Sequence, residues 1–369
     1  MNITVPFKPF AKALAIVAPV SPSNPSQRAL ACVHITAGDT ITLRTTDLVT
    51  FAQATSDGEV NKPGSALVST KALADAIRVL PAASSSVTIE VKDDKLRLSC
   101  GKARHAIATL DPDEFPTWPH AFELGAIVNP AELHRAIKIV EHAASGDETR
   151  PRLAAIKMIA DGKTLTLVTT DGHRLAKTAM PCDATFDLLV PAKSAATLLR
   201  VLDSATGEVR FGTDGATYAG LRTDAHEIVV RTHDAATFPP WSQVVPAQSK
   251  TRATLSRELF IAALRNVEVA ARTNVKDAGT VSMVRVSLTA GEVTLDGANT
   301  DGAVANDEID CDYAGKPLTF GANAVYMLHA LNALTSDDVT IDIAGELDPM
   351  RIEPVSDDPS LLIVMPARL

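Results

Sequence analysis

Several things that this sequence lacks limit what the protein can be. Aromatic side chains make up only 4% of the 369 residues, so alanine, valine, leucine and isoleucine must fill the core. The four cysteines lie far apart without a CxxC pair, so we expect free thiols in a reducing cytoplasm and no zinc site; they are Cys32, Cys100, Cys182 and Cys311. No apolar run reaches about 18 residues and no basic-then-apolar leader is visible, so neither a membrane span nor a signal peptide is expected.

An excess of positive charge is also missing. Lysine and arginine number 35 against 44 acidic residues, a formal net charge of −9. A protein that coats nucleic acid with its whole surface needs the opposite balance, because phosphate binding requires lysine and arginine. The deficit is uneven: residues 249–369 carry −8, which leaves −1 for residues 1–248. The apolar fraction of 46% predicts a folded chain with a sizeable core rather than a disordered one.

What the chain does have is an order of parts that occurs three times. Apolar residues at three- and four-residue steps predict a first helix in each part, at residues 6–20, 129–145 and 256–271, with Asn129 and Ser256 as helix starts. A β-branched strand pair follows and ends in a turn whose aspartates, 124 and 130 residues apart, are Asp47, Asp171 and Asp301. A second helix is expected at residues 71–81, 193–203 and 322–334.

The common spacing predicts three copies of one α+β unit, each with both helices on one side of a sheet. The domains are expected at residues 1–124, 125–248 and 249–369.

The most distinctive string runs from Thr170 to Ala176 and reads TDGHRLA. Asp-Gly after a strand is typical of a tight turn. An enzyme could use Asp171 and His173 as an acid–base pair, but no nucleophile or metal cluster accompanies them, and aspartate recurs at each repeat's turn. A hairpin with an aspartate cap and a surface histidine is the simpler interpretation. We therefore predict no catalytic residue, no metal and no cofactor.

The TDGHRLA string, the threefold repeat and the C-terminal VMPARL resemble the bacterial DNA polymerase III beta subunit, the beta sliding clamp. Further matches are TTDL (45–48), DEFPTWP (113–119), LVPAKS (189–194) and FPPWSQVVP (238–246), so the resemblance covers the whole chain. It implies three α+β sliding-clamp domains, with helices lining the lumen of a ring and antiparallel sheets outside. The ring is a head-to-tail homodimer around duplex DNA.

The resemblance also implies a function. Such a protein is a cytoplasmic processivity factor of DNA replication without catalytic activity. Its implied partners are double-stranded DNA, bound without sequence preference, a second copy of itself, the DNA polymerase III alpha subunit, the clamp loader and other proteins with clamp-binding motifs.

In the family, partner peptides bind a hydrophobic cleft between the second and third domains. Carried over position by position, the cleft consists of Leu153, Thr170, Gly172, His173, Arg174, Leu175, Pro239, Val244, Ile363, Met365, Pro366, Ala367, Arg368 and Leu369. An apolar pocket with a few polar groups suits a short peptide with hydrophobic anchors. A simple buried terminus is the alternative for the last members of this set. Family members often have methionine where Ala367 stands, a change that should enlarge or flatten the pocket.

The resemblance assigns DNA contacts and a dimer seam as well. The DNA-binding candidates are Arg28, Lys71, Arg78, Arg150, Arg152 and Lys193, for which ordinary solvated faces are the alternative. The seam is expected to join His105 to Ala271 and Arg272.

Some positions depart from the family's pattern. The family's Gly-Arg-Pro loop is replaced here by residues 23–28, and its tyrosine pair by Pro151-Arg152. These departures leave open a protein–protein adaptor that keeps the clamp fold without encircling DNA.

Overall fold

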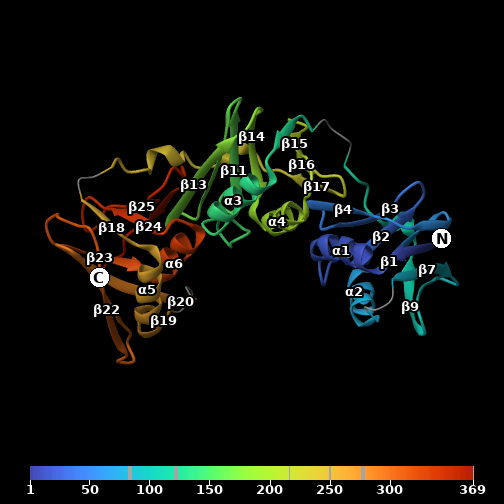
Figure 1. Cartoon of the computed structure of the whole chain (residues 1–369), viewed down its shortest axis with the longest axis horizontal. Coiled ribbons are helices and arrows are strands. Elements are labelled where there is room, and N and C mark those ends of the chain that lie inside the picture. Colours follow the sequence, from blue (N-terminus) through green and yellow to red (C-terminus); the bar gives the residue numbers. More distant parts are fainter. Residues whose placement is uncertain (82–84, 120–123, 216, 249–250, 276–278, 369) are drawn as a thin grey trace. The chain divides into compact units, whose positions relative to one another are not determined.

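The computed structural model describes residues 1–81, 85–119, 124–215, 217–248, 251–275 and 279–368 (Figure 1). The chain forms two compact units, which we describe separately. Unit 1 comprises Met1–His134 and Cys182–His233, and unit 2 comprises Arg135–Pro181 and Asp234–Leu369. The middle of the three expected domains therefore contributes to both units.

Unit 1 is built on one sheet of thirteen antiparallel strands, in the order β10-β15-β16-β17-β4-β3-β2-β6-β9-β8-β7-β1-β5. Strands from the first and middle thirds of the chain join where β17 pairs with β4, from His226↔Ala54 to Val230↔Thr50. The strands from the first third are β1 (Asn2–Pro6), β2 (Cys32–Ala37), β3 (Ile41–Thr46), β4 (Thr50–Ser56), β5 (Glu59–Lys62), β6 (Gly64–Ser69), β7 (Ser86–Lys92), β8 (Lys95–Cys100) and β9 (Ala103–Leu110). Those from the middle third are β10 (Ala126–Val128), β15 (Val209–Thr213), β16 (Tyr218–Arg222) and β17 (His226–Arg231), and β14 (Thr185–Pro191) also belongs to this unit.

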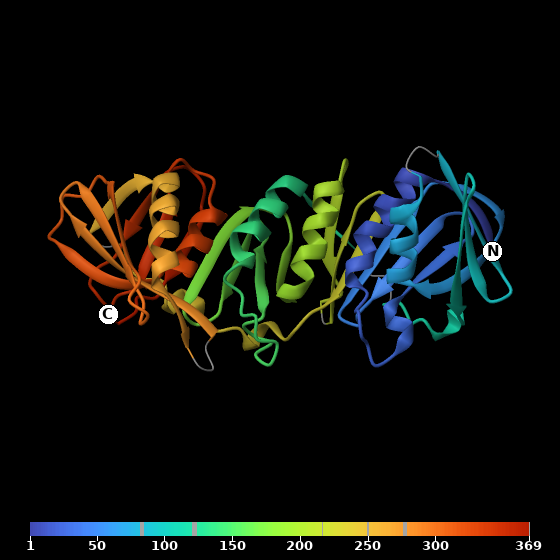
Figure 2. The ribbon, with the colours of Figure 1, turned by 90° about the horizontal axis from the view of Figure 1, so that it is seen from below.

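Three helices of unit 1 agree with the sequence prediction: α1 (Phe7–Val17), α2 (Thr70–Val79) and α4 (Ala195–Ser204). A 3-10 turn extends α1 to Val20, and another precedes α4 at Ala192–Ser194. Figure 2 shows α1 and α2 side by side against the sheet. Phe10 and Leu73 point into the core with almost no exposed surface, as the apolar spacing requires.

Unit 2 contains two sheets. In one, strands follow each other in the order β11-β12-β13-β26-β25-β24-β18; their bounds are β11 (Ala155–Asp161), β12 (Thr164–Thr170), β13 (Arg174–Pro181), β18 (Arg252–Ser256), β24 (Asp338–Asp342), β25 (Met350–Pro354) and β26 (Leu361–Val364). The other has the order β19-β20-β21-β22 with β23 beside β20; the bounds are β19 (Arg272–Val275), β20 (Gly279–Thr289), β21 (Glu292–Ala298), β22 (Val304–Asp310) and β23 (Leu318–Asn323). β13 pairs with β26 from Arg174↔Val364 to Lys177↔Leu361, which joins the middle third to the C-terminal strand.

The remaining helices are α3 (Pro130–Glu141), α5 (Arg257–Ala271) and α6 (Ala324–Ala333). The predicted helix starts are confirmed: Asn129 Oδ1 accepts hydrogen bonds from the N–H groups of Ala131 and Glu132 at 2.9 and 3.2 Å, and Ser256 caps α5. α5 and α6 pack together (Figure 2).

The end of each first helix shows how the copies are related. The eleventh helical residue is Val17 in α1, Val140 in α3 and Val267 in α5. In the first two copies a strand threonine donates its hydroxyl to that valine's carbonyl oxygen: Thr45 to Val17 at 2.6 Å and Thr169 to Val140 at 2.5 Å. In the third copy Gly297 occupies the place of the threonine, and a Cβ there would lie 2.3 Å from the Val267 oxygen.

The turn that follows corrects one detail of the predicted repeat. Asp47 and Asp171 accept backbone hydrogen bonds from residues two and three positions later. In the third copy this acceptor is Asn299, which receives the N–H groups of Asp301 and Ala303, both at 3.0 Å. Asn299 is therefore the counterpart of Asp47 and Asp171, and its amide oxygen takes the place of their carboxylate. The predicted alignment of Asp301 with those two aspartates is wrong by two residues.

Replacing Gly297 by alanine should destabilise unit 2 by about 1–3 kcal/mol, because the new methyl group would overlap a backbone oxygen that cannot move aside. Gly38→Ala is the matched control, since a Cβ at Gly38 meets no atom within 4 Å. Urea denaturation followed by circular dichroism measures both. Equal midpoints for the two variants would contradict the close approach of α5 to β21.

Candidate functional site

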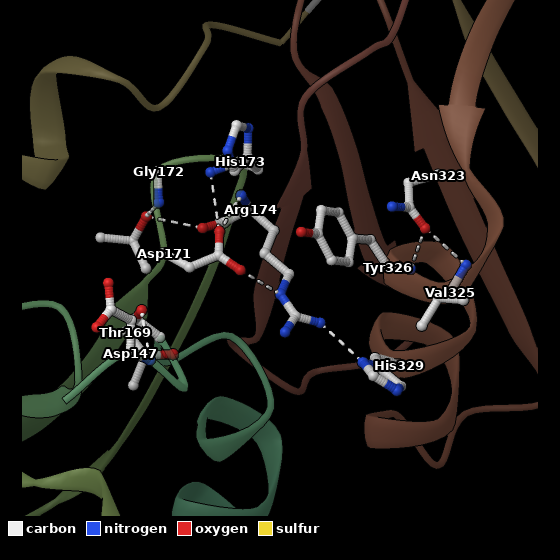
Figure 3. Close-up of polar contacts among 12 residues, drawn as sticks. Asp147, Thr169, Asp171, Gly172, His173, Arg174, Asn323, Val325, Tyr326 and His329 are labelled. Carbon is white, nitrogen blue, oxygen red and sulfur yellow. Dashed lines mark hydrogen bonds and ion pairs between the residues drawn. The ribbon is translucent and has the colours of Figure 1, made fainter. Parts of the chain in front are cut away.

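The TDGHR segment forms a rigid turn at the start of β13. Asp171 Oδ1 accepts the backbone N–H groups of His173 and Arg174 at 2.8 and 3.1 Å. Thr170 donates its hydroxyl to the Arg174 carbonyl oxygen at 2.7 Å. Gly172 has φ +96°, a conformation that disfavours a side chain and explains the glycine. The turn thus presents Gly172 and His173 to solvent while Asp171 stays buried (Figure 3).

Arg174 links this turn to α6. Its Nε donates to Asp171 Oδ2 at 2.9 Å, and its Nη1 lies 2.8 Å from His329 Nδ1. The guanidinium carbon also lies 4.4 Å from the centre of the Tyr326 ring, a cation–π contact. Only 11% of the side chain is exposed. Figure 3 shows the arginine reaching from the turn to Tyr326 and His329 on the helix.

Two histidines stand next to this arginine. The ring centres of His142 and His329 are 6.2 Å apart. Burial, the charge of Arg174 and His329 lower the pKa of His142 to about 3. Partial burial and Arg174 also lower the pKa of His329. At neutral pH both rings are therefore uncharged, and Arg174 is the cation of the group.

An apolar groove of about 880 Å³ opens beside the turn, entirely within unit 2. Its lining comes from five separate parts of the chain, at residues 152–153, 170–175, 237–246, 349 and 363–365. Predicted cleft residues that line it are Leu153, Thr170, Gly172, Arg174, Leu175, Pro239, Val244, Ile363 and Met365. Two of these present large apolar surfaces to solvent, since Val244 is 57% and Met365 40% exposed. Such a groove fits apolar anchors of a short peptide.

The C-terminal residues approach the groove through backbone hydrogen bonds. Met365 N–H donates to the His173 carbonyl oxygen at 2.9 Å, and Ala367 N–H donates to the Gly321 oxygen at 2.8 Å. Four predicted cleft residues do not line the groove: His173, Pro366, Ala367 and Arg368. Leu369 lies outside the described residues.

Sequence reasoning missed several lining residues: Thr237, Phe238, Pro240, Trp241, Gln243, Val245, Pro246 and Pro349. All but Thr237 and Pro349 belong to the FPPWSQVVP string, so the signal was present. Trp241 is held by Lys177, whose Nζ lies 5.6 Å from the indole centre. Arg152, predicted to contact DNA, also lines the groove; it is exposed and forms no ion pair within the described part of the chain.

The other DNA-binding candidates lie on the surface of both units. Arg28 and Lys71 are exposed in unit 1, at the start of a 3-10 turn and of α2. Three candidates pair with carboxylates: Arg78 with Asp75 at 2.7 Å, Arg150 with Asp147 at 3.2 Å, and Lys193 with Asp47 at 2.8 Å. Part of their charge is therefore already neutralised.

The predicted seam residues differ in accessibility. His105 is half-buried on β9, opposite Leu98 of β8. Ala271 is only 2% exposed, so its side chain belongs to the core of unit 2 rather than to an outer surface. Arg272 is exposed and pairs with Glu268 at 2.8 Å. The hydrogen bond from Arg272 lowers the pKa of Glu268 by more than burial of the carboxylate raises it.

Across the described residues, no helix is long and apolar enough to cross a bilayer. Over the same residues, no group of three or more histidine, cysteine or carboxylate side chains is arranged to hold a metal ion.

Known proteins match the whole chain. The DNA polymerase III beta subunit family matches in three parts: its N-terminal domain at residues 1–119, its central domain at 127–240 and its C-terminal domain at 242–368. The beta sliding clamp of Vibrio cholerae is 29% identical over 86% of each chain, and that of Streptomyces coelicolor is 26% identical over the whole of both. The solved structure of a sliding clamp from Bartonella birtlesii bound to griselimycin is 25% identical, covers both chains fully and gives a TM-score of 0.90.

Lowering the pH should weaken unit 2 through His142. Its folded pKa lies near 3, below the ordinary value of 6.5, so the unfolded chain takes up a proton first. The stability contributed by the neutral ring is complete above pH 6.5 and is lost as the pH falls toward 3, by up to about 1.4 kcal/mol per pH unit. Trp241 fluorescence in a Trp118→Phe background measures urea midpoints at pH 7 and pH 5. His142→Leu should show the smaller difference, and equal differences would contradict this role.

Proposed function

Because the chain belongs to the DNA polymerase III beta subunit family, the beta sliding clamps, we propose that it encircles duplex DNA and tethers the replicative polymerase to it. The observation that supports this most directly is the apolar groove beside the TDGHR turn, which offers a docking place for a peptide. The polymerase III alpha subunit, the clamp loader and other proteins with clamp-binding motifs are the proposed occupants. The protein works as a cytoplasmic processivity factor and has no catalytic activity of its own. Its proposed domains span residues 1–124, 125–248 and 249–369.

DNA contact is proposed for the helices rather than the sheets. In unit 1 the adjacent helices α1, α2 and α4 expose a set of basic side chains: Lys8, Lys12, Arg78 and Arg200. The ion pair of Arg78 with Asp75 is a surface pair and holds the arginine only weakly. Such groups attract phosphates without reading bases, so contact is salt-sensitive and independent of sequence. Arg28 extends this basic set from its 3-10 turn.

A head-to-tail homodimer is proposed, and the way each copy contacts the next supports it. In unit 1 the first turn holds the start of the second copy's helix: Asp47 pairs with Lys193, and Thr50 shares a 2.8 Å hydrogen bond with Ser194. In unit 2 the second turn holds α6 through Arg174. The third turn, at residues 299–303, is exposed, and Asp301 forms no ion pair within the described part of the chain.

The free partner for this third turn is the start of α2. Lys71 stands 122 residues before Lys193 and is exposed; it is the second residue of α2, whereas Lys193 lies in the 3-10 turn that precedes α4. We therefore place Lys71 opposite Asp301 of a second copy, at the seam rather than on DNA. Two such seams close a ring of six similar domains.

Open strand edges support the same seam. β9 pairs with β6 at Thr109 and Leu110, and in the part of the chain that the structure describes no strand pairs with residues 103–108, including His105, on that side. β22 is the edge strand of its sheet and exposes Val304 by 77%. β9 carries Arg104, whereas β22 carries Asp307, Glu308 and Asp310. Edge strands of opposite charge favour each other and disfavour pairing with their own kind. Arg272, at the end of α5, is proposed to flank this seam.

Reversing the charge of Lys71 should open the ring. We expect Lys71→Glu to raise the dimer dissociation constant about tenfold, because like charges then face each other at both seams. Adding Asp301→Lys should restore the dimer. Sedimentation measures the dimer, and retention on nicked circular DNA after loading measures ring closure. Lys8→Glu is the control, since it removes a basic group of α1 and should leave the dimer unchanged.

The DNA measurement also separates the clamp from a clamp-fold adaptor. A topological clamp stays on circular DNA and runs off when the circle is cut. An adaptor that does not encircle DNA gives no difference between circular and linear DNA, and this result would overturn the proposal even if the dimer forms.

The groove is proposed to take a peptide with apolar anchors and one carboxylate. The apolar lining receives the anchors, and Arg152 at the groove has no acidic partner in the described part of the chain. Griselimycin, present in the structure of the Bartonella birtlesii clamp, is proposed to occupy the same groove here.

Removing residues 365–369 should abolish peptide binding while leaving the dimer intact. The deletion removes Met365 from the lining and the two backbone hydrogen bonds that hold the tail. Fluorescence polarisation with labelled griselimycin should show at least a tenfold loss, and light scattering should still give a mass near twice 38.9 kDa. Arg368→Ala, which does not touch the lining, should bind normally. Unchanged affinity of the truncated protein would show that the groove is not the site.

A further inference from the structure

Among the groove-lining residues in the described part of the chain, Arg174 alone is also hydrogen-bonded to a side chain of α6. It is held on two sides, by Asp171 Oδ2 at 2.9 Å and by His329 Nδ1 at 2.8 Å, and it lies against the Tyr326 ring. Arginine has only donors, so His329 Nδ1 must accept this hydrogen bond. The imidazole is therefore neutral and carries its proton on Nε2. His329 itself does not line the groove.

The surroundings of His329 make a second positive charge unfavourable. The charged and titratable groups that face it are Arg174 from the start of β13, with Asp171 behind it, His142 from the segment after α3, and Tyr326 one turn earlier on α6. Asp171 is already occupied by Arg174 and two backbone N–H groups. His142 offers no compensating charge, because an imidazole is either neutral or positive. Its two ring nitrogens also lack hydrogen-bond partners in the described part of the chain.

Protonation of His329 would turn its Nδ1 from an acceptor into a donor. Nη1 of Arg174 and the new N–H group would then point at each other, and two cations would stand side by side. Arg174 would leave α6, and with it would move the turn to which it belongs, from which Thr170, Arg174 and Leu175 line the groove. His329 is exposed on its outer side, so solvent protons reach it.

We propose that His329 is a positioning residue for peptide binding: while neutral it holds Arg174 and with it the Thr170–Leu175 wall of the groove, and its protonation weakens peptide binding. This rests on the proposed role of the groove. It gives the clamp an affinity for its partners that depends on pH. The residue that controls this dependence, His329, lies on α6 of the third domain and not in the lining of the groove. Because partial burial and Arg174 lower the pKa of His329, affinity is complete at neutral pH and is lost below the ordinary histidine value of about 6.5.

Two substitutions separate positioning from folding. His329→Gln keeps an oxygen that can accept from Arg174 but does not titrate, whereas His329→Leu cannot accept at all. Binding of labelled griselimycin is measured for each between pH 7.5 and pH 5.0, with circular dichroism at each pH to confirm the fold. His142→Leu is the matched control, since it removes the neighbouring ring without touching the Arg174 bond.

Wild-type affinity should fall about tenfold from pH 7.5 to pH 5.0. His329→Gln should bind like wild type at pH 7.5 and change less than threefold, and His329→Leu should be about tenfold weaker at every pH. His142→Leu should keep a decline on acidification. A glutamine variant that follows the wild-type pH curve, or a leucine variant that binds like wild type, would overturn the inference. Absence of griselimycin binding to the wild type at pH 7.5 would overturn the groove assignment and the inference together.

Discussion

The two oxygens of a turn carboxylate organise this structure. One oxygen closes the turn by accepting backbone N–H groups, as in Asp47 and Asp171, and the other binds a cation, Lys193 for Asp47 and Arg174 for Asp171. The Asp47–Lys193 pair connects the first turn to the second copy directly. The Asp171–Arg174 pair lies within the second turn, and Arg174 in turn bonds to His329 of α6 in the third copy. Asn299 can close the third turn but has no second carboxylate oxygen, so that turn is left with Asp301 as its exposed acid. The first two carboxylates thus serve the contacts between successive copies of the repeat. The third turn, which lacks the second carboxylate oxygen, is the proposed point of contact with another chain.

The acidity of the last third has a different meaning once residues are placed. A net charge of −9 seems unsuited to a partner made of phosphate, but the acidic side chains of β22 lie on a strand edge and the basic ones of unit 1 on its helices. These charges fit the roles proposed for the two elements: the basic helices attract DNA, and the acidic strand edge repels DNA and selects a second copy of the chain. Arg174, by contrast, is buried and neutralised, so it acts on geometry rather than on the field around the protein.

Local patterns predicted the helices well, because Asn129 and Ser256 cap them and apolar spacing fixes their buried faces. The TDGHR turn was predictable for the same local reason. The pairing of β17 with β4 and of β13 with β26 was not, since strand partners far apart in sequence leave no local pattern. Residues 237–246 have irregular backbone without periodicity, so no local pattern marked Trp241 as a lining residue. The ion pairs of Arg78 and Arg150 also depend on geometry that spacing does not supply.

The grip of each turn on the following helix has a mechanical consequence. Joints inside one chain have the polypeptide running beside them, so they can loosen but never separate. In the proposed dimer, by contrast, the third turn of one copy meets a different chain, so non-covalent contacts alone hold that joint. The proposed ring is therefore expected to open at the joints between chains, where no backbone limits how far a loosened contact can move apart.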